Sequence, residues 1–134
     1  MSQHHTALVY TMVLVSAADR EMTDSELMTI GDTVKHLPIF ADYDLDQLPK
    51  AAQACAELLS QENGLEAVLA FIIENLPSKL SETAYAIALD VAAADAAVSQ
   101  EELRLLELLR HRLQVGRLPA AAIERGTRAR NMRL

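Results

Sequence analysis

Two stretches of the sequence lie 76 residues apart and match each other: VSAADREMTDSEL (Val15–Leu27) and VAAADAAVSQEEL (Val91–Leu103). Each copy consists of an apolar segment, an acidic corner and the start of an amphipathic segment. The identical pairs are Val15/Val91, Ala17/Ala93, Ala18/Ala94, Asp19/Asp95, Glu26/Glu102 and Leu27/Leu103. Because both segments carry a helical pattern, we predict two helical hairpins, over about residues 5–37 and 81–113, with their first helices side by side.

The second helix of each copy starts at a capping box. In Thr23–Glu26 and Ser99–Glu102, a hydroxyl residue is followed three positions later by glutamate. In such a box each side chain satisfies a backbone N–H group of the first helical turn. Apolar residues then recur at helical spacing, and we expect Leu14 and Leu103 to lie in the core.

Helical signals cover the rest of the chain. Pro38 ends the second helix, Asp44 or Asp46 opens the third, and Ser78 and Ser81 are candidate caps of the fifth. The chain is therefore predicted to be all-α, a single domain over residues 1–134 with one core. The seven expected helices span about residues 5–18, 24–37, 44–60, 62–76, 81–94, 99–113 and 118–134, the last of them basic.

The composition supports this fold class. Of the 134 residues, 51% are hydrophobic and 23% charged, which excludes intrinsic disorder, and four glycines and four prolines are too few for a many-stranded β-fold. A lone cysteine, Cys55, excludes an intramolecular disulfide and a zinc site of several thiolates. It lies in an alanine-rich helical segment, where we expect it to be buried.

No segment predicts a membrane span. The longest apolar run, Thr6–Ala18, has 13 residues, whereas a spanning helix needs roughly 18. The preceding residues contain no lysine or arginine, which a secretory signal would carry. We therefore expect a cytoplasmic protein that is not embedded in a membrane, with peripheral association left open.

Charge is divided unevenly along the chain. Residues 1–109 hold five Lys and Arg against 18 Asp and Glu, whereas residues 110–134 hold seven Arg against one Glu. The acidic body disfavours nucleic acid as a ligand and favours cations or basic partners. The basic segment either docks on this body or binds an anionic partner or membrane surface; the first alternative is the simpler.

The phrases AADREMTDSEL and AADAAVSQEEL, together with the seven expected helices, resemble the TerB-like tellurite-resistance family over nearly the whole chain. Where that family has glycine after Ala-Asp, this chain has Arg20 and Ala96. The resemblance implies an all-helical, non-enzymatic protein of the bacterial stress response. It also implies metal-ion binding by acidic residues at the helix corners.

Two interpretations of the acidic corners stay open. Asp19, Glu26, Asp95 and Glu102 are candidate ligands for a divalent cation such as calcium, which takes oxygen ligands from carboxylates, carbonyls and water. The alternative is that the glutamates only complete capping boxes and the aspartates only end helices. No other cofactor is predicted.

Other motifs do not predict catalysis. Asp42–Asp46 imitates the start of a calcium loop, but Gln47 and Gln53 replace the required glycine and glutamate. His4 and His5 are expected at a frayed terminus, and the sequence contains no nucleophile elbow, Walker A motif or paired-histidine metal motif. We predict no enzyme and neither catalytic nor cofactor-binding residues. Protein partners are expected, and the sequence leaves the oligomeric state open.

Overall fold

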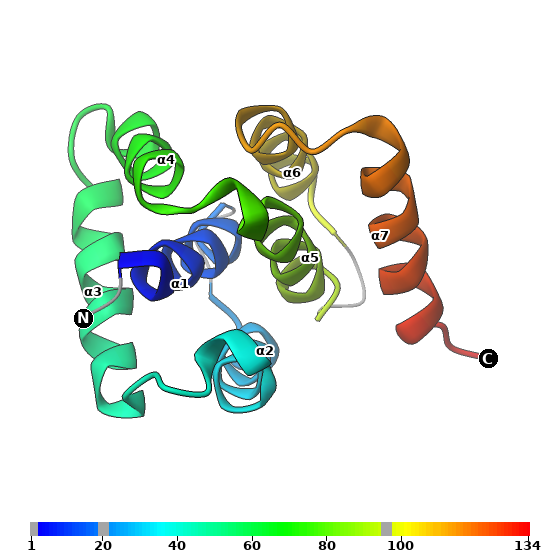
Figure 1. Cartoon of the computed structure of the whole chain (residues 1–134), viewed down its shortest axis with the longest axis horizontal. Coiled ribbons are helices and arrows are strands. Elements are labelled where there is room, and N and C mark those ends of the chain that lie inside the picture. Colours follow the sequence, from blue (N-terminus) through cyan, green and yellow to red (C-terminus); the bar gives the residue numbers. More distant parts are fainter. Residues whose placement is uncertain (1–2, 19–21, 95–97) are drawn as a thin grey trace.

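A computed structural model describes residues 3–18, 22–94 and 98–134 of the chain. Within them the prediction of an all-α fold is confirmed, because every regular element is a helix (Figure 1). The elements are α1 (Gln3–Ser16), α2 (Asp24–His36), η1 (Pro38–Phe40), η2 (Leu45–Gln47), α3 (Leu48–Leu59), α4 (Gly64–Asn75), η3 (Ser78–Leu80), α5 (Ser81–Ala92), α6 (Gln100–Arg112) and α7 (Arg117–Arg130), where η denotes a short 3₁₀ helix.

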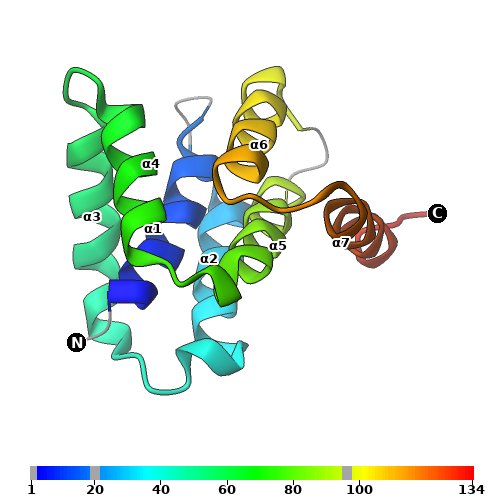
Figure 2. The same cartoon turned by 45° about the horizontal axis from the view of Figure 1, so that its top comes forward.

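Helix α1 is the centre of the fold. It is apolar nearly all round, and every residue from Ala7 to Ser16 is buried. A helix without a polar face needs neighbours on all sides. Helices α2, α3, α4, α5 and α6 supply them, and α7 packs outside this group against α5 (Figures 1 and 2).

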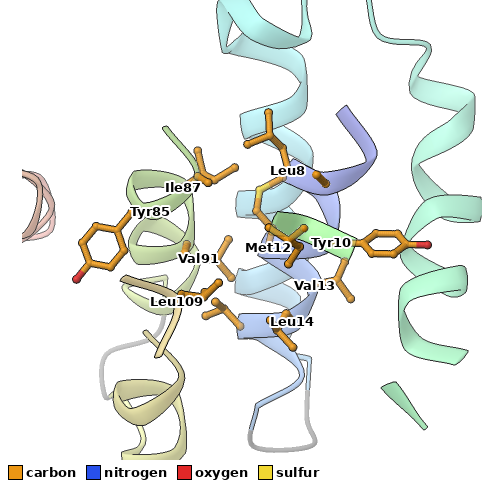
Figure 3. Close-up of a cluster of buried hydrophobic side chains, with 14 of the residues drawn as sticks. Leu8, Tyr10, Met12, Val13, Leu14, Tyr85, Ile87, Val91 and Leu109 are labelled. Atoms are coloured by element: carbon orange, nitrogen blue, oxygen red, sulfur yellow. The ribbon is translucent and has the colours of Figure 1, made fainter. Parts of the chain in front are cut away.

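Part of the core lies between the first helices of the two hairpins, α1–α2 and α5–α6. Leu8, Met12 and Leu14 of α1 lie opposite Ile87 and Val91 of α5 (Figure 3). Leu109 of α6 closes this cluster. The side-by-side packing expected for the two apolar segments is therefore present.

The expected burial of Leu103 is wrong. Its side chain is 49% exposed, as is that of Leu27, the matching residue in α2, whereas Leu14 is buried as predicted. The buried face of α6 runs through Glu102, Leu105 and Leu109, at intervals of three and four residues. Leu103 lies 100° round the helix from Glu102, which turns it toward solvent.

The N-terminal caps of α3 and α5 differ from the predictions. Asp44 does accept a hydrogen bond from the Asp46 N–H, but it caps η2, and α3 follows. The expected serine caps of α5 are wrong, since Leu80 holds the N-cap position without a side-chain hydrogen bond. The turn η3 directly precedes α5, and a backbone hydrogen bond from the Leu80 N–H to the Pro77 carbonyl stabilises it.

The expected fraying of His5 is also wrong. Its side chain is buried, and its ring lies against Phe40 and Tyr43. Its Nε2–H donates a hydrogen bond of 2.7 Å to the Ile39 carbonyl, and the same nitrogen lies 3.4 Å from an Asp42 carboxylate oxygen. The start of α1 is thus fixed by the segment that links α2 to α3.

The basic helix α7 docks on the body, as the simpler alternative predicted. Ala120 and Thr127 are buried against α5, Arg130 pairs with Asp90 at 3.1 Å, and the Tyr85 hydroxyl donates a 2.6 Å hydrogen bond to Glu124. In the part of the chain that the structure describes, no helix has the length and apolar character to cross a bilayer.

Candidate functional site

The first acidic corner is built around Glu26 at the start of α2. Its backbone N–H donates to Thr23 Oγ1 at 3.1 Å, and its Oε1 accepts from the Thr23 N–H at 3.0 Å. The buried Ser16 hydroxyl donates to the same Oε1 at 3.2 Å. The predicted capping box is therefore confirmed, and Ser16 also ties it to the end of α1.

The second corner repeats this arrangement at the start of α6. The Glu102 N–H donates to Ser99 Oγ at 3.1 Å, and the Ser99 N–H donates to Glu102 Oε1 at 3.0 Å. The N-cap backbones of the two corners nearly coincide, at φ −77°, ψ 162° for Thr23 and φ −72°, ψ 162° for Ser99. The matching position to Ser16 is Ala92, so the link to the preceding helix differs between the copies.

Both glutamates are more deeply buried than a cap requires. Glu26 is 1% exposed and Glu102 is 2% exposed, although capping-box glutamates belong to the first turn at a helix surface. In Glu26 the second oxygen, Oε2, is buried and accepts no hydrogen bond in the structure as described. A buried carboxylate oxygen without a partner costs free energy, about 1–3 kcal/mol or more for a charged group.

The structure describes two of the four predicted metal ligands. Asp19 and Asp95 lie outside the described residues, while Glu26 and Glu102 each lie at the base of their own corner. Within the described residues, no three His, Cys, Asp or Glu side chains gather in a way that could hold a metal ion. The capping role of the two glutamates is thus confirmed, and metal ligation stays a prediction.

The sequence patterns did not predict a leucine groove that lies beside the corners. It is a cavity of about 440 Å³ between the ends of α1 and α3, the start of α4 and one face of α6. It is mostly apolar, with one acid and one base on its α6 wall. Its lining residues are Leu14, Ala17, Ala18, Leu59, Leu65, Glu101, Arg104, Leu105 and Leu108.

The sequence contained one signal for this groove. Helix α6 has leucine at five of the seven positions from 103 to 109, which is more than one buried face of a helix can take up. Leu105, Leu106 and Leu109 fill that face, so Leu108 remains partly exposed, and it lines the groove together with Leu65 of α4. Only the packing of α1, α3 and α4 around this part of α6 turns the surplus into a groove.

The lone cysteine is built into the core, as predicted. Cys55 is fully buried, and its thiol approaches the Tyr10 carbonyl at 3.9 Å. Burial raises the pKa of this thiol to about 12, because an apolar environment disfavours the thiolate. The reactive thiolate form is therefore scarce at neutral pH.

Comparisons of this chain with models of protein families, with curated proteins and with solved structures give no match. The resemblance to the TerB-like family therefore stays a prediction based on the two corner motifs.

Proposed function

We propose that this protein is a non-enzymatic helical module of a cytoplasmic stress response, of the TerB-like kind, that binds a divalent cation at its acidic corners. One observation carries the proposal: the buried Oε2 of Glu26, which accepts no hydrogen bond from the described residues. A cation is the simplest group to compensate a buried carboxylate oxygen of this kind.

The chemistry of the first corner fits a hard cation. Calcium binds oxygen atoms from carboxylates, backbone carbonyls and water, at six to eight positions. Oε1 of Glu26 is occupied by the Thr23 N–H and the Ser16 hydroxyl, which fixes the carboxylate and leaves Oε2 for a ligand. Asp19 and Glu21 precede this glutamate in the same corner segment and would supply further carboxylates.

Calorimetric titration of the protein with calcium, and separately with magnesium, tests the proposal. The variant Glu26→Gln removes the charge while keeping the capping box, since glutamine also serves at this position. The matched control is Asp24→Asn, which removes an exposed carboxylate from the same helical turn. We expect Glu26→Gln to weaken binding at least tenfold and Asp24→Asn to leave it nearly unchanged.

A thermal readout makes the same test independent of the heat of binding. A cation that binds only the folded chain adds about 2.7 kcal/mol of stability at a concentration of 100 Kd. The wild type should therefore melt higher in calcium, and Glu26→Gln should lose most of this rise. Absence of both heat and stabilisation in the wild type, or equal binding by Glu26→Gln, would refute cation binding at this corner.

A protein-interaction scaffold without a ligand is the second candidate, and the leucine groove is the observation that favours it. Apolar clefts of a few hundred Å³ with few polar groups are typical of binding sites. A wild-type protein that binds no divalent cation, yet captures a partner that Leu65→Asp no longer captures, would support the scaffold over the cation-binding module.

A further inference from the structure

Helix α7 presents positive charge to solvent. Arg117, Arg125 and Arg128 are exposed, and none of them forms an ion pair with a described residue, whereas Arg130 is held by Asp90. The body from residue 1 to 109 carries a net charge of −13. One end of the molecule is therefore cationic and the rest strongly anionic, which favours contact between opposite ends of two copies.

The same helix carries an apolar side chain that its own body does not use. Leu118 is 84% exposed, the highest value of any leucine within a helix of the described chain. Helix α7 packs on α5 through Ala120, Ile123 and Thr127. Leu118 precedes Ala120 by two positions, about 200° round the helix, so it points away from α5.

The leucine groove can accept such a side chain. It is apolar over most of its lining, and at about 440 Å³ it lies within the range of clefts that hold ligands. Its α6 wall supplies Glu101, and the α3–α4 turn beside it contains the exposed Glu62. These carboxylates outnumber the single cation of the wall, Arg104, so the groove suits a leucine on a helix that also carries arginines.

The groove and α7 of one molecule lie too far apart in the fold to meet. The groove is formed by α1, α3, α4 and α6, whereas α7 lies on the outer side of α5, away from α3 and α4, in both views (Figures 1 and 2). Because α7 is held on α5 by Arg130–Asp90 and Tyr85–Glu124, any contact with the groove has to come from a second copy.

We infer that α7 of one copy docks on the leucine groove of another, with Leu118 in the groove and the neighbouring arginines facing the acidic body. This contact joins two different surfaces. In a dimer, the copy that uses its α7 keeps a free groove, and the copy that uses its groove keeps a free α7. Heterologous contacts of this kind extend head to tail unless they close into a ring. The inference is independent of cation binding.

Sedimentation velocity of the whole chain over increasing protein concentration tests the inference. We expect the average mass of the wild type to rise with concentration at low ionic strength. The rise should shrink at about 1 M salt, where the Debye length falls from roughly 10 Å to 3 Å. A wild type that stays monomeric up to millimolar concentration at low salt would overturn the inference.

Two variants remove one surface each. Leu118→Asp removes the apolar side chain of α7, and Leu65→Asp places a charge at the groove; both positions lie in the first turn of a helix, where aspartate is tolerated well. The matched control is Leu27→Asp, a half-exposed leucine near the start of α2 that belongs to neither surface. We expect both variants to be monomeric and the control to associate like the wild type.

Mixing the two variants gives the decisive result. Leu118→Asp retains a groove and Leu65→Asp retains an α7, so an equimolar mixture should form dimers and nothing larger. If Leu65→Asp abolishes association and Leu118→Asp does not, two grooves face each other and the inference is wrong. It is equally wrong if the mixture stays monomeric, or if the control loses association. Circular dichroism of each variant verifies that the fold is retained.

Discussion

Replacing Leu109 by alanine should destabilise the protein much more than the same replacement at Leu103, although both leucines belong to α6. Leu109 is fully buried and contacts the cluster between α1 and α5 (Figure 3). Leu103 is half exposed, with solvent on one side. The two variants therefore share the same helix, residue type and substitution, and they differ only in how deeply the leucine is buried.

The magnitude follows from the two positions. Leucine-to-alanine changes in a packed core cost about 2–5 kcal/mol, because a cavity adds to the lost transfer free energy. Full burial of a leucine is worth about 1.5–3 kcal/mol, so a half-buried one that leaves no cavity loses below about 1 kcal/mol on truncation. We expect Leu109→Ala in the first range and Leu103→Ala in the second.

Thermal unfolding measures the difference directly. With an unfolding entropy of about 2.1 cal/mol/K per residue, each kcal/mol shifts the Tm of a chain of 134 residues by about 3.6 °C. Leu109→Ala should then lower the Tm by roughly 7–18 °C, and Leu103→Ala by less than roughly 4 °C. Equal losses in the two variants would mean that α6 presents a different face to the core.

Four further outcomes are expected. Thr23→Ala and Ser99→Ala should each cost about 0.5–2 kcal/mol in denaturant unfolding, because each removes the side chain that accepts the N3 N–H; a loss at only one position would contradict the equivalence of the corners. Cys55 should react with a thiol reagent only after unfolding, since burial hides the thiol and raises its pKa to about 12, which keeps it protonated at pH 8. For the same reason purified protein should not reduce tellurite in the presence of a thiol donor, and reduction that disappears in Cys55→Ser would disprove this. Burial and the hydrogen bond to Glu124 raise the pKa of Tyr85 above its ordinary 10.0. The protonated Tyr85 therefore contributes fully to the free energy of unfolding below pH 10, and this contribution falls as the pH rises further. Tyr85→Phe should flatten the loss of stability above pH 10.

The sequence was sufficient for those features that depend on neighbours along the chain. A capping box needs a hydroxyl residue and a glutamate three positions apart, and both boxes form as predicted at Thr23 and Ser99. The all-α class follows in the same way, because the helical spacing of apolar residues is a local pattern.

Where the prediction failed, several side chains could satisfy the same local pattern. Leu103 matches the helical stripe of α6, but the partners of that helix select the face through Leu105 and Leu109. Serine near the start of α5 is a plausible cap, yet the turn that enters this helix makes the cap unnecessary. His5 is held in place by a hydrogen bond to Ile39, which lies 34 residues later in the chain, so the residues around His5 could not predict it.

By itself, the sequence determined the helices, the two capped corners, the buried cysteine and the separation of acidic from basic charge. These follow from spacing, composition and the hydrogen-bonding needs of helix ends, which act over a few residues. Only the tertiary structure decided that a buried oxygen of Glu26 accepts no hydrogen bond from the described residues, that leucines of α4 and α6 border a groove, and that Leu118 points away from the body. These properties depend on which distant surfaces meet when the helices pack, and packing is a property of the whole chain.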